Sequence, residues 1–361
     1  MSVPKVLLIS GEYPPLPGGV GDYTANLRMA LAAMGGRSVV LTSTGASGED
    51  VTIVRRWGWG VVGNVRRMIR HEQIDVVHIQ YQAGAFAMHP ALNLLPSLLS
   101  RQVPVVTTFH DLRVPYLFPK AGRLRKSAIV RMARGSAAVI VTNPADQRAL
   151  ANEGIDTIQI PIGPNLPPPA RIEAVDDSAV AFFGFPSRSK GIFDLLDAIA
   201  TLPDPRPTLV LIGAQGEPSS TNDIVASVEI DALATLHGIT VRRTGYLSPL
   251  DASNALAASG VIALPFLDGA SLRSGSLLAA LQSGRPVVTT TPRLVSDLGD
   301  LESSPQLLTV STGDTVALAE AIRLALVSEW RTTSLPSAFR WQSIATAHAD
   351  LYQRVIAERS Q

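Results

Sequence analysis

A loop of glycine, serine and a single arginine offers the clearest opportunity for chemistry in this sequence. The loop follows an apolar run at residues 261–265 and leads into a helix expected at residues 276–282. Backbone N–H groups at a helix N-terminus have no intrahelical partner, and together with the helix dipole they favour an anion. Arg273 adds a planar fork that suits phosphate oxygens. The alternative is an ordinary strand–turn–helix whose small residues only allow close packing.

A second candidate for phosphate binding is the segment FFGFPSRSKGIFDLL, residues 182–196. A strand is expected to end at Gly184, and Arg188 and Lys190 then precede Gly191 and an amphipathic helix. A lysine at such a turn is a point charge for a phosphate group. Both cations could instead be ordinary solvated surface groups.

A glycine-rich loop also follows the first predicted strand. Gly18, Gly19 and Gly21 lie in the segment GEYPPLPGGVGDYTANL and lead into a helix expected to begin near Asp22. Glycine lets the backbone approach a ligand closely, and the helix N-terminus favours negative charge. The loop is too long for the dinucleotide fingerprint and lacks its GxGxxG spacing. A flexible turn is the competing interpretation.

His110 is expected just past the carboxyl end of a strand, in the segment TTFHD beside Asp111. Active sites of open α/β sheets lie at that end of the strands, which makes His110 a candidate catalytic residue. A structural role is the alternative, and it is the interpretation adopted for the other histidines, including His78 on an apolar strand.

Another strand-end turn, TGYLSPLD at residues 244–251, precedes a helix with a polar start. The backbone of Gly245, Tyr246 and Leu247 could contact the flat edge of a base. The turn could equally be a plain connection between two elements.

Composition excludes several classes of function. The chain has 361 residues and a net charge of +1, so its overall charge does not indicate a nucleic-acid-binding protein. There are no cysteines, which removes disulfides, thiolate nucleophiles and thiolate metal sites. No DxD pair and no His/Asp/Glu cluster with ligand-like spacing occurs, so no metal is expected. The absence of a GxSxG elbow argues against serine hydrolase chemistry.

Two features bear on membranes. The apolar run before Gly11 is too short for a signal peptide and is interpreted as a buried strand, and no apolar run approaches the roughly 20 residues that span a bilayer. The stretch from Lys120 to Arg134 carries six cations, no acid and an apolar side. It is a candidate surface for anionic lipid or an anionic acceptor, and a solvated helix face is the alternative.

The elements that must position these residues alternate between apolar, β-rich runs and helical patterns. Continuous apolar runs fit parallel strands that are covered on both faces. In the first half they occur at residues 6–10, 39–42, 76–79, 105–109 and 139–142, with helices such as 23–33, 61–71 and 124–134 between them. This pattern predicts a doubly wound α/β domain.

The same pattern starts again after PIGPNLPPPA, a proline-rich segment near Ile160 that is expected to be an extended linker. A second doubly wound domain is therefore predicted, and residues 341–359 form one or two amphipathic helices. Two such domains joined by a hinge are expected to enclose a cleft, with the strand carboxyl ends facing it. The predicted strands of the second domain are residues 179–183, 208–212, 239–244, 261–264, 287–290 and 307–310.

Taken together, these motifs resemble the group 1, GT4-like glycosyltransferases of the GT-B fold. The resemblance rests on the PPxxGGVGxY loop, FHD at a later strand end, GxxxxxKG opening the second domain, the glycine turn at Gly245 and the closing loop–helix–GxPVV segment, in that order from Gly18 to Val288. It implies two facing Rossmann-like domains. The first, residues 1–165, would bind the acceptor and be completed by a C-terminal helix at about 341–361; the second, residues 171–335, would bind the donor.

The resemblance also implies transfer of a sugar from a nucleotide-diphosphate donor with retention of configuration, without an essential metal or a cofactor. By family role, Gly18 and Gly19 would lie at the donor phosphate, and His110 at the sugar. Lys190 would neutralise the leaving diphosphate. The other expected donor-binding residues are Arg188, Gly245, Tyr246, Leu247, Ser271, Leu272, Arg273, Ser274, Gly275 and Ser276.

Three positions depart from the family pattern. Phe185 stands where an arginine is common, with Arg188 close enough to substitute. Ser271 and Ala279 stand where two glutamates usually contact the sugar and the ribose. Asp268 lies close to the first of these positions and is counted with His110 and Lys190 among the expected catalytic residues. Ala279 cannot accept hydrogen bonds from a ribose, so Arg273 and residues 274–276 are expected to contribute more to nucleotide binding.

The leading hypothesis is a cytoplasmic glycosyltransferase, with possible peripheral contact at the inner membrane face, whose acceptor is a glycan, a lipid-linked molecule or a small molecule, as in polysaccharide biosynthesis. A sugar-nucleotide epimerase on the same fold would need more acid/base carboxylates than the motifs supply. A non-catalytic protein that binds a glycan or a partner is conceivable because the two glutamates are missing, although Lys190 and the glycine loops argue for retained phosphate chemistry.

Overall fold

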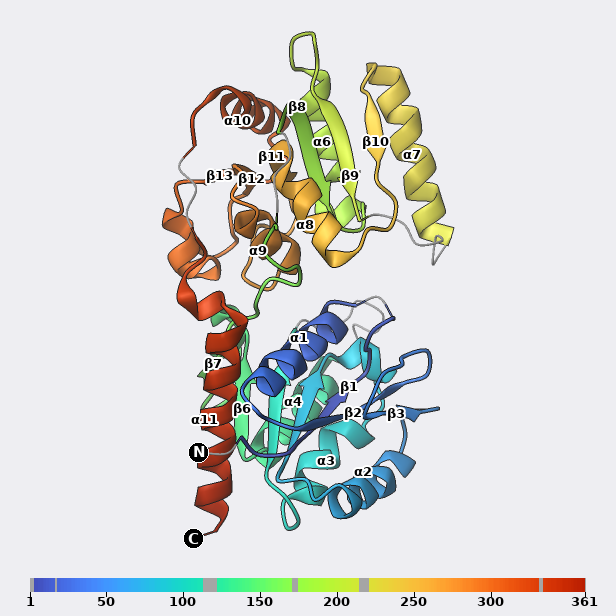
Figure 1. The fold of residues 1–361 in the computed structure, drawn as a ribbon, viewed down its shortest axis with the longest axis vertical. Helices are drawn as coiled ribbons and strands as arrows, with labels where there is room; N and C mark the ends of the chain where they lie inside the picture. Colours follow the sequence, from blue (N-terminus) through green and yellow to red (C-terminus); the bar gives the residue numbers. More distant parts are fainter. Residues whose placement is uncertain are drawn as a thin grey trace. The chain divides into compact units, whose positions relative to one another are not determined.

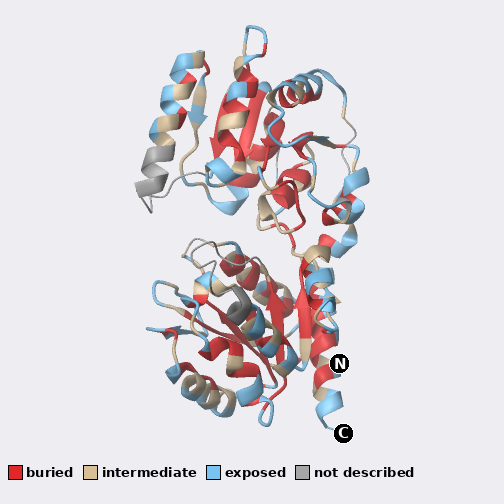
Figure 2. Ribbon diagram, turned by 180° about the vertical axis from the view of Figure 1, so that it is seen from behind, coloured by how far each residue is buried: buried red, intermediate tan, exposed pale blue. Residues whose placement is uncertain are grey.

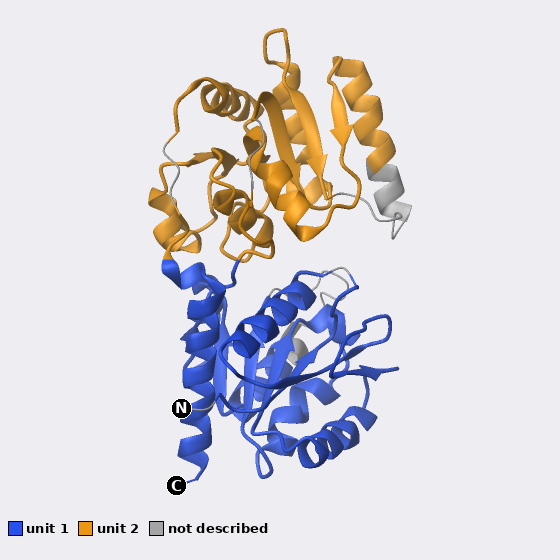
Figure 3. Ribbon diagram, in the orientation of Figure 1, with its two compact units in different colours: residues 1–163, 337–361 blue, residues 164–336 orange. Residues whose placement is uncertain are grey.

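The apolar runs of the sequence form two parallel sheets in the computed structural model, which describes residues 3–16, 18–112, 122–170, 175–213, 221–330 and 334–360 (Figure 1). The chain divides into two compact units (Figure 3). Unit 1 is Met1–Gly163 with Ser337–Gln361, and unit 2 is Pro164–Pro336. The fold class expected from the sequence, two doubly wound Rossmann-like domains, is confirmed.

Unit 1 contains a seven-stranded parallel sheet in the order β3-β2-β1-β4-β5-β6-β7. Its strands are β1 (Val6–Ser10), β2 (Ser38–Ser43), β3 (Val51–Val54), β4 (Val76–Tyr81), β5 (Val105–Phe109), β6 (Ala138–Val141) and β7 (Ile158–Gln159). Its α-helices are α1 (Gly19–Ala33), α2 (Gly60–His71), α3 (Ala91–Leu99), α4 (Gly122–Gly135), α5 (Pro144–Ala151) and α11 (Trp341–Arg359), with short 3₁₀ helices η1 (Ala83–Phe86) and η6 (Ser337–Phe339).

The central strands of unit 1 are buried on both faces because alternate side chains enter two different apolar clusters (Figure 2). On β1, Leu7 and Ile9 join the cluster that contains α2, α3 and α4 residues, whereas Val6 and Leu8 join the cluster that contains α1 and α11 residues. This explains the continuous apolar runs. The C-terminal helix α11 thus covers the same face of the unit 1 sheet as α1.

Unit 2 contains a six-stranded parallel sheet in the order β10-β9-β8-β11-β12-β13. Its strands are β8 (Asp176–Phe183), β9 (Thr208–Ile212), β10 (Val241–Arg243), β11 (Ser259–Leu264), β12 (Val287–Thr290) and β13 (Leu307–Val310). Its helices are α6 (Ile192–Ala200), α7 (Thr221–His237), α8 (Pro249–Ala257), α9 (Gly275–Gln282), α10 (Thr315–Val327) and the 3₁₀ turns η3 (Arg188–Lys190), η4 (Val295–Asp297) and η5 (Gly299–Ser303).

Side-chain caps fix where several helices begin. Asn143, Ser248, Ser274 and Asp314 each accept a hydrogen bond from the backbone N–H three residues later, at the starts of α5, α8, α9 and α10. These caps satisfy donors that would otherwise have no partner at the helix N-termini.

The structure corrects two sequence-based element boundaries and adds two strands to the unit 1 sheet. Helix α1 begins at Gly19 rather than near Asp22, so Gly19 and Gly21 belong to its first turn. Strand β10 is shorter than the expected 239–244. The edge strands β3 and β7 were not predicted, because VTIV is short and partly polar and β7 has only two residues.

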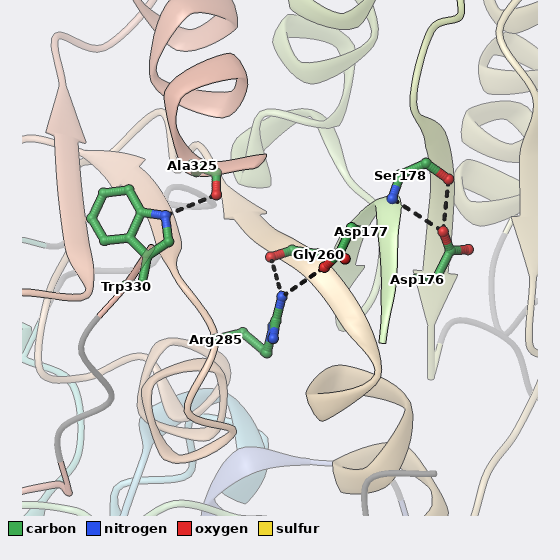
Figure 4. Close-up of polar contacts among 7 residues, drawn as sticks. All are labelled: Asp176, Asp177, Ser178, Gly260, Arg285, Ala325 and Trp330. Atoms are coloured by element: carbon green, nitrogen blue, oxygen red, sulfur yellow. Dashed lines mark hydrogen bonds and ion pairs between the residues drawn. The ribbon is translucent and has the colours of Figure 1, made fainter. Parts of the chain in front are cut away.

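A polar cluster lies at the amino ends of the unit 2 strands (Figure 4). Arg285, just before β12, donates from Nη2 to the Gly260 carbonyl at 3.0 Å, and the same nitrogen lies 3.6 Å from Asp177 Oδ1 on β8. Burial lowers the pKa of Arg285. Because ligands of parallel α/β sheets bind at the opposite, carboxyl edge, the arginine of the GxPVV segment has a structural role.

Candidate active site

His110 lies directly after β5, at the carboxyl edge of the unit 1 sheet, as the sequence predicted. Its backbone N–H donates to the Tyr81 carbonyl at 3.2 Å, and its Nε2 lies 2.8 Å from Gln80 Oε1. The ring of Tyr23 on α1 packs edge-on against it at 4.7 Å between centroids. Burial, with a smaller contribution from His348, lowers the pKa of His110 to about 3, so the imidazole is neutral at neutral pH.

Gln80 joins His110 to a buried polar network that sequence reasoning missed. The Gln80 amide nitrogen lies 3.2 Å from Nδ1 of His78, and that same ring nitrogen lies 2.7 Å from the hydroxyl of Tyr352 on α11. His78 Nε2 lies 2.7 Å from Thr108 Oγ1. Polar residues at alternate positions of a fully buried strand, HIQ in β4, were the signal available in the sequence.

A second branch of this network links α1 to α11. His348 Nδ1 lies 2.8 Å from the Ile344 carbonyl, so this nitrogen carries the proton and Nε2 accepts from the Tyr23 hydroxyl at 3.3 Å. Burial lowers the pKa of His348 to about 4, and burial together with the neighbouring His348 and His110 lowers the pKa of His78 well below its usual value. The three histidines are therefore neutral rings whose nitrogens fix one another's orientation.

The N-terminus of α1 is occupied by a carboxylate of the chain itself, Glu12, which the sequence motifs did not predict. Glu12 Oε1 accepts from the backbone N–H groups of Val20 and Gly21 at 3.0 and 3.3 Å. A Cβ on Gly18 would lie 2.2 Å from the Glu12 carboxyl carbon, whereas a Cβ on Gly19 would meet nothing within 4 Å. Gly18 therefore makes room for Glu12, and Gly19 faces open space.

Lys190 lies in the turn between β8 and α6. Its ammonium is close to Gly184, since a Cβ there would be 2.9 Å from Nζ. The side chain is partly buried, burial lowers its pKa, and Nζ makes no ion pair or hydrogen bond with the residues that the structure describes. A desolvated, uncompensated cation is well suited to receive an anion.

Gly191 fixes the Lys190 turn against the loop that follows β11. Its φ is +73°, and a Cβ there would lie 1.9 Å from the Pro265 carbonyl oxygen. The two loops are joined directly because the Leu267 N–H donates to the Ser189 carbonyl at 3.0 Å. Only glycine fits this combination of backbone conformation and close approach.

The N-terminus of α9 forms the other half of the unit 2 site. Ser271 Oγ accepts from Arg273 N at 3.3 Å, and Ser274 Oγ accepts from Leu277 N at 3.3 Å. Within the described chain, the N–H groups of Gly275 and Ser276 are left without a partner. The expected donor residues of this loop, from Ser271 and Leu272 through Arg273 to Ser276, therefore lie together at an anion-favouring helix end.

Asn165, in the proline-rich segment, is a further polar residue at this helix end. Its Oδ1 is buried without a hydrogen-bond partner among the described residues, and it lies 3.3 Å from the position that a Cβ of Gly275 would take. The next residue is fixed to α9, because Gln282 Nε2 donates to the Leu166 carbonyl at 2.9 Å. The segment predicted only as a linker thus contributes to the unit 2 site.

Two expected site residues are engaged elsewhere. Asp268 Oδ1 lies 2.5 Å from Nη2 of Arg293. Arg188 donates to Glu229 on α7 at 2.6 Å, and its guanidinium lies 4.5 Å from the centroid of the Phe193 ring. In this structure both side chains are therefore held in ion pairs within unit 2.

The remaining expected positions lie where the sequence placed them. Gly245 (φ +68°) and Leu247 lie in the turn after β10, with Tyr246 79% exposed between them. Ala279 is buried within α9 and offers no acceptor. Of the basic stretch, Lys120 lies outside the described residues, while Lys126 on α4 is 2.5 Å from Glu153 Oε1 and Met132 is buried in the core.

Together these elements define two Rossmann-like units with cationic and helix-end anion sites at strand carboxyl ends, the class of a GT-B sugar-nucleotide glycosyltransferase. Residues 17–171 match the model of glycosyltransferase family 4, and residues 177–327 match that of the group 1 glycosyl transferases. The chain belongs to the GT4-like, group 1 glycosyltransferases, as the sequence motifs suggested.

Solved structures share the fold over the whole chain. Sucrose-phosphate synthase from Thermosynechococcus elongatus matches with a TM-score of 0.71 at 18% identity, covering 98% of this chain and 100% of that one. HepE from Anabaena, in complex with UDP, matches with a TM-score of 0.68 at 19% identity over 99% of both chains. HepE in complex with UDP-glucose gives a TM-score of 0.65 at 19% identity and covers 98% of each chain. No curated protein matches the sequence.

None of the helices in the described part of the chain is long and apolar enough to cross a membrane. The described residues also bring together no group of three histidine or acidic side chains in a metal-binding arrangement.

Proposed function

We propose that this glycosyltransferase transfers a sugar from a nucleoside-diphosphate sugar to a glycan, lipid-linked or small-molecule acceptor, with retention of configuration and without an essential metal. Breaking the glycosyl–phosphate bond places negative charge on the diphosphate. Lys190 and the N–H groups of Gly275 and Ser276 are the groups that would stabilise that charge. The observation that carries the proposal is the backbone bond between the Lys190 turn and the loop before α9, which holds both anion-binding features in one rigid assembly.

The nucleotide would be held differently from the common family pattern. With Ala279 in place of a glutamate, the ribose hydroxyls need other partners. Asn165 Oδ1 and the serines at 274 and 276 offer acceptors at this helix end. Gly245, Tyr246 and Leu247 would border the base. His110, neutral because of its lowered pKa, would act at the sugar through hydrogen bonds rather than as a cation.

The protein is further proposed to act in the cytoplasm, with the basic stretch from Lys120 to Arg134 as a possible contact for the inner membrane face. The described part of that stretch also supports a simpler role, since Lys126 is paired with Glu153 and Ile129 and Val130 pack against the core. Sedimentation with vesicles that contain or lack anionic lipid would distinguish a membrane contact from this simpler structural role.

The proposed role of Lys190 has a direct test. Lys190→Ala should lower the rate of UDP-sugar hydrolysis or transfer by about 10²–10³, because it removes one charge-stabilising group from the transition state. UDP is the first probe since HepE was solved with UDP and UDP-glucose. Calorimetry with UDP, GDP and ADP would show whether ground-state binding weakens too.

Lys5→Ala serves as the matched control because it removes the same charge from an ion pair with Glu72, at the amino end of β1. Its rate should stay within about twofold of the wild type. An unchanged rate in a folded Lys190→Ala protein would remove Lys190 from the mechanism. Failure of every nucleotide to bind would favour a non-catalytic binding role.

A further inference from the structure

Strands β2 and β3 lie at one side of the unit 1 sheet (Figure 1). A cavity of about 440 Å³ lies beyond their carboxyl ends. None of the residues assigned above to donor binding or catalysis contributes to it. Its lining includes Ser43, Arg55, Arg56, Trp57, Ala87 and His89. The cavity opens on the same edge of the sheet as His110, because all the strands are parallel.

The apolar wall of this cavity is fixed in place. Trp57 is 7% exposed, and its ring packs edge-on against Phe86 of η1 with centroids 4.7 Å apart. Trp57 Nε1 donates to Ser43 Oγ at 2.8 Å, and that hydroxyl in turn donates to the Gly11 carbonyl. The indole is therefore held by both packing and a hydrogen-bonded chain, which gives the cavity a preformed surface.

Two adjacent arginines add positive charge beside the apolar wall of the cavity. Arg55 and Arg56 follow β3 directly, are exposed, and make no ion pair or hydrogen bond with any residue that the structure describes. None of the described residues that line the cavity is an aspartate or a glutamate. Two uncompensated guanidinium groups beside a concave surface form an anion-attracting site, and their planar forks suit phosphate or carboxylate oxygens.

His89 adds a hydrogen-bond donor on the rim. Its Nδ1 accepts from the Ala91 N–H at 3.1 Å, which leaves Nε2 as the ring nitrogen that can donate. Trp59, 57% exposed, packs edge-on against this ring at 5.9 Å. An exposed indole beside polar donors provides a flat apolar surface against which a sugar ring can lie.

The backbone that presents His89 is strained. Ala87 and Met88 have φ values of +51° and +54°, in the left-handed region that non-glycine residues rarely adopt. Such conformations cluster at ligand sites, where the surrounding structure holds them. Ala87 itself lines the cavity.

We propose that this cavity binds the acceptor substrate through an anionic group, a phosphate or carboxylate carried by a sugar, with Arg55 and Arg56 as the anion ligands and Trp59 against the ring. The proposal rests on the proposed transferase function and narrows its acceptor class to anionic molecules. The phosphate can belong to a soluble sugar phosphate or to a lipid headgroup, which present the same chemistry to the two arginines.

Tryptophan fluorescence tests the proposal because Trp57 lines the cavity and Trp59 packs against His89, which also lines it. The probes are α-D-glucose 1-phosphate, glucuronate, inorganic phosphate and glucose, each titrated into the full-length protein with saturating UDP. We expect a saturable change with at least one anionic sugar, none with glucose, and at least tenfold weaker binding in Arg55→Gln/Arg56→Gln. The matched control Arg67→Gln/Arg70→Gln removes the same charge from α2 and should bind as the wild type does.

Equal binding to the wild type and to Arg55→Gln/Arg56→Gln, or no binding of any anionic probe to the wild type, would overturn the proposal. Vesicles of phosphatidylcholine with and without phosphatidylglycerol distinguish the source of the phosphate: sedimentation that needs anionic lipid and both arginines assigns it to a lipid headgroup. UDP-sugar hydrolysis, measured in the wild type and in the control Arg67→Gln/Arg70→Gln, should be equal. Its absence from the wild type would contradict the proposed transferase function while leaving the anion-binding result intact.

Discussion

Gln80 determines which nitrogen of the His110 ring carries the proton. The amide oxygen of Gln80 faces His110 Nε2 at 2.8 Å, while its nitrogen faces His78. Because an amide oxygen only accepts, His110 Nε2 carries the proton and Nδ1 keeps its lone pair. With its pKa lowered to about 3, the ring is a neutral hydrogen-bonding group of fixed orientation.

Gln80→Glu should change the protonation of His110 with little change in shape. A carboxylate at this distance stabilises the imidazolium and raises the pKa of His110 by roughly 1–3 units. We expect the NMR titration of His110 to move upward from about 3 and the activity to acquire an acid limb at pH 4–6. Asn93→Asp, which places a carboxylate in the same core beside Tyr81, should shift neither. The same shift in both variants would contradict the positioning role of Gln80.

The limits of prediction from sequence are clearest for individual residues and their contacts. Lys190, Gly191 and the residues from Ser271 to Ser276 were recognisable because each lies in a short segment whose local chemistry is characteristic. Gln80 and His110 are 30 residues apart, and they meet only through the register of β4 on β5. The pairing of Arg188 with Glu229 across 41 residues likewise depends on how α7 packs, so it cannot be deduced from the motif.

At the scale of elements, α11 is both a covering helix and a source of buried polar groups. Its residues Ile344 and Leu351 pack in the cluster under α1, while His348 and Tyr352 enter the network below His110. The apolar runs predicted the central strands because those are buried on both faces. The unit 1 edge strands β3 and β7 escaped prediction because VTIV is short and partly polar and β7 has only two residues. The amphipathic pattern of α11 did not reveal which sheet it covers.

The neutral histidines held by α11 should make unit 1 sensitive to acid. In the folded state their pKa values lie below the ordinary 6.5, so between about pH 4 and 6.5 the unfolded chain binds more protons than the folded one. The free energy of unfolding is therefore greatest above pH 6.5 and falls as the pH decreases. For His348 alone the loss by pH 5 is about 2 kcal/mol.

Urea unfolding at pH 7.5 and pH 5 would measure this loss. His348→Gln should reduce the difference between the two pH values, whereas His71→Gln, at the exposed end of α2, should leave it unchanged. A wild-type protein equally stable at both pH values would show that the buried histidines do not control acid stability.

At the scale of the molecule, the chain divides its chemistry between two units. Figure 3 shows the two units. Most residues proposed to hold the nucleotide, Lys190, Arg273 and residues 274–276 among them, belong to unit 2. Gly18, Gly19, His110 and the arginine-lined cavity belong to unit 1. Two Rossmann-like domains were predictable from the repeated alternation of apolar runs and helices. The inclusion of Asn165 in the unit 2 site was not, because the proline-rich segment offers no periodic pattern.

Hydrogen exchange measured by mass spectrometry should reveal this division. On addition of UDP we expect slower exchange in unit 2, in the turn around Lys190 and in the loop before α9, because these segments would contact the diphosphate. The strands of unit 1 and α11 should exchange at unchanged rates. Protection confined to unit 1 would instead place the nucleotide there and contradict the assignment of the donor site.

Glu12 has a consequence for selectivity among anions. Because its carboxylate already accepts from the first N–H groups of α1, any free anion must compete there with one tethered in the same chain, whose effective concentration is on the order of millimolar or higher. Inorganic phosphate and free nucleotides therefore gain little binding free energy at this helix end. The Glu12 carboxylate therefore makes the unit 1 glycine loop selective against small anions. Only a substrate that is held by additional contacts can displace it.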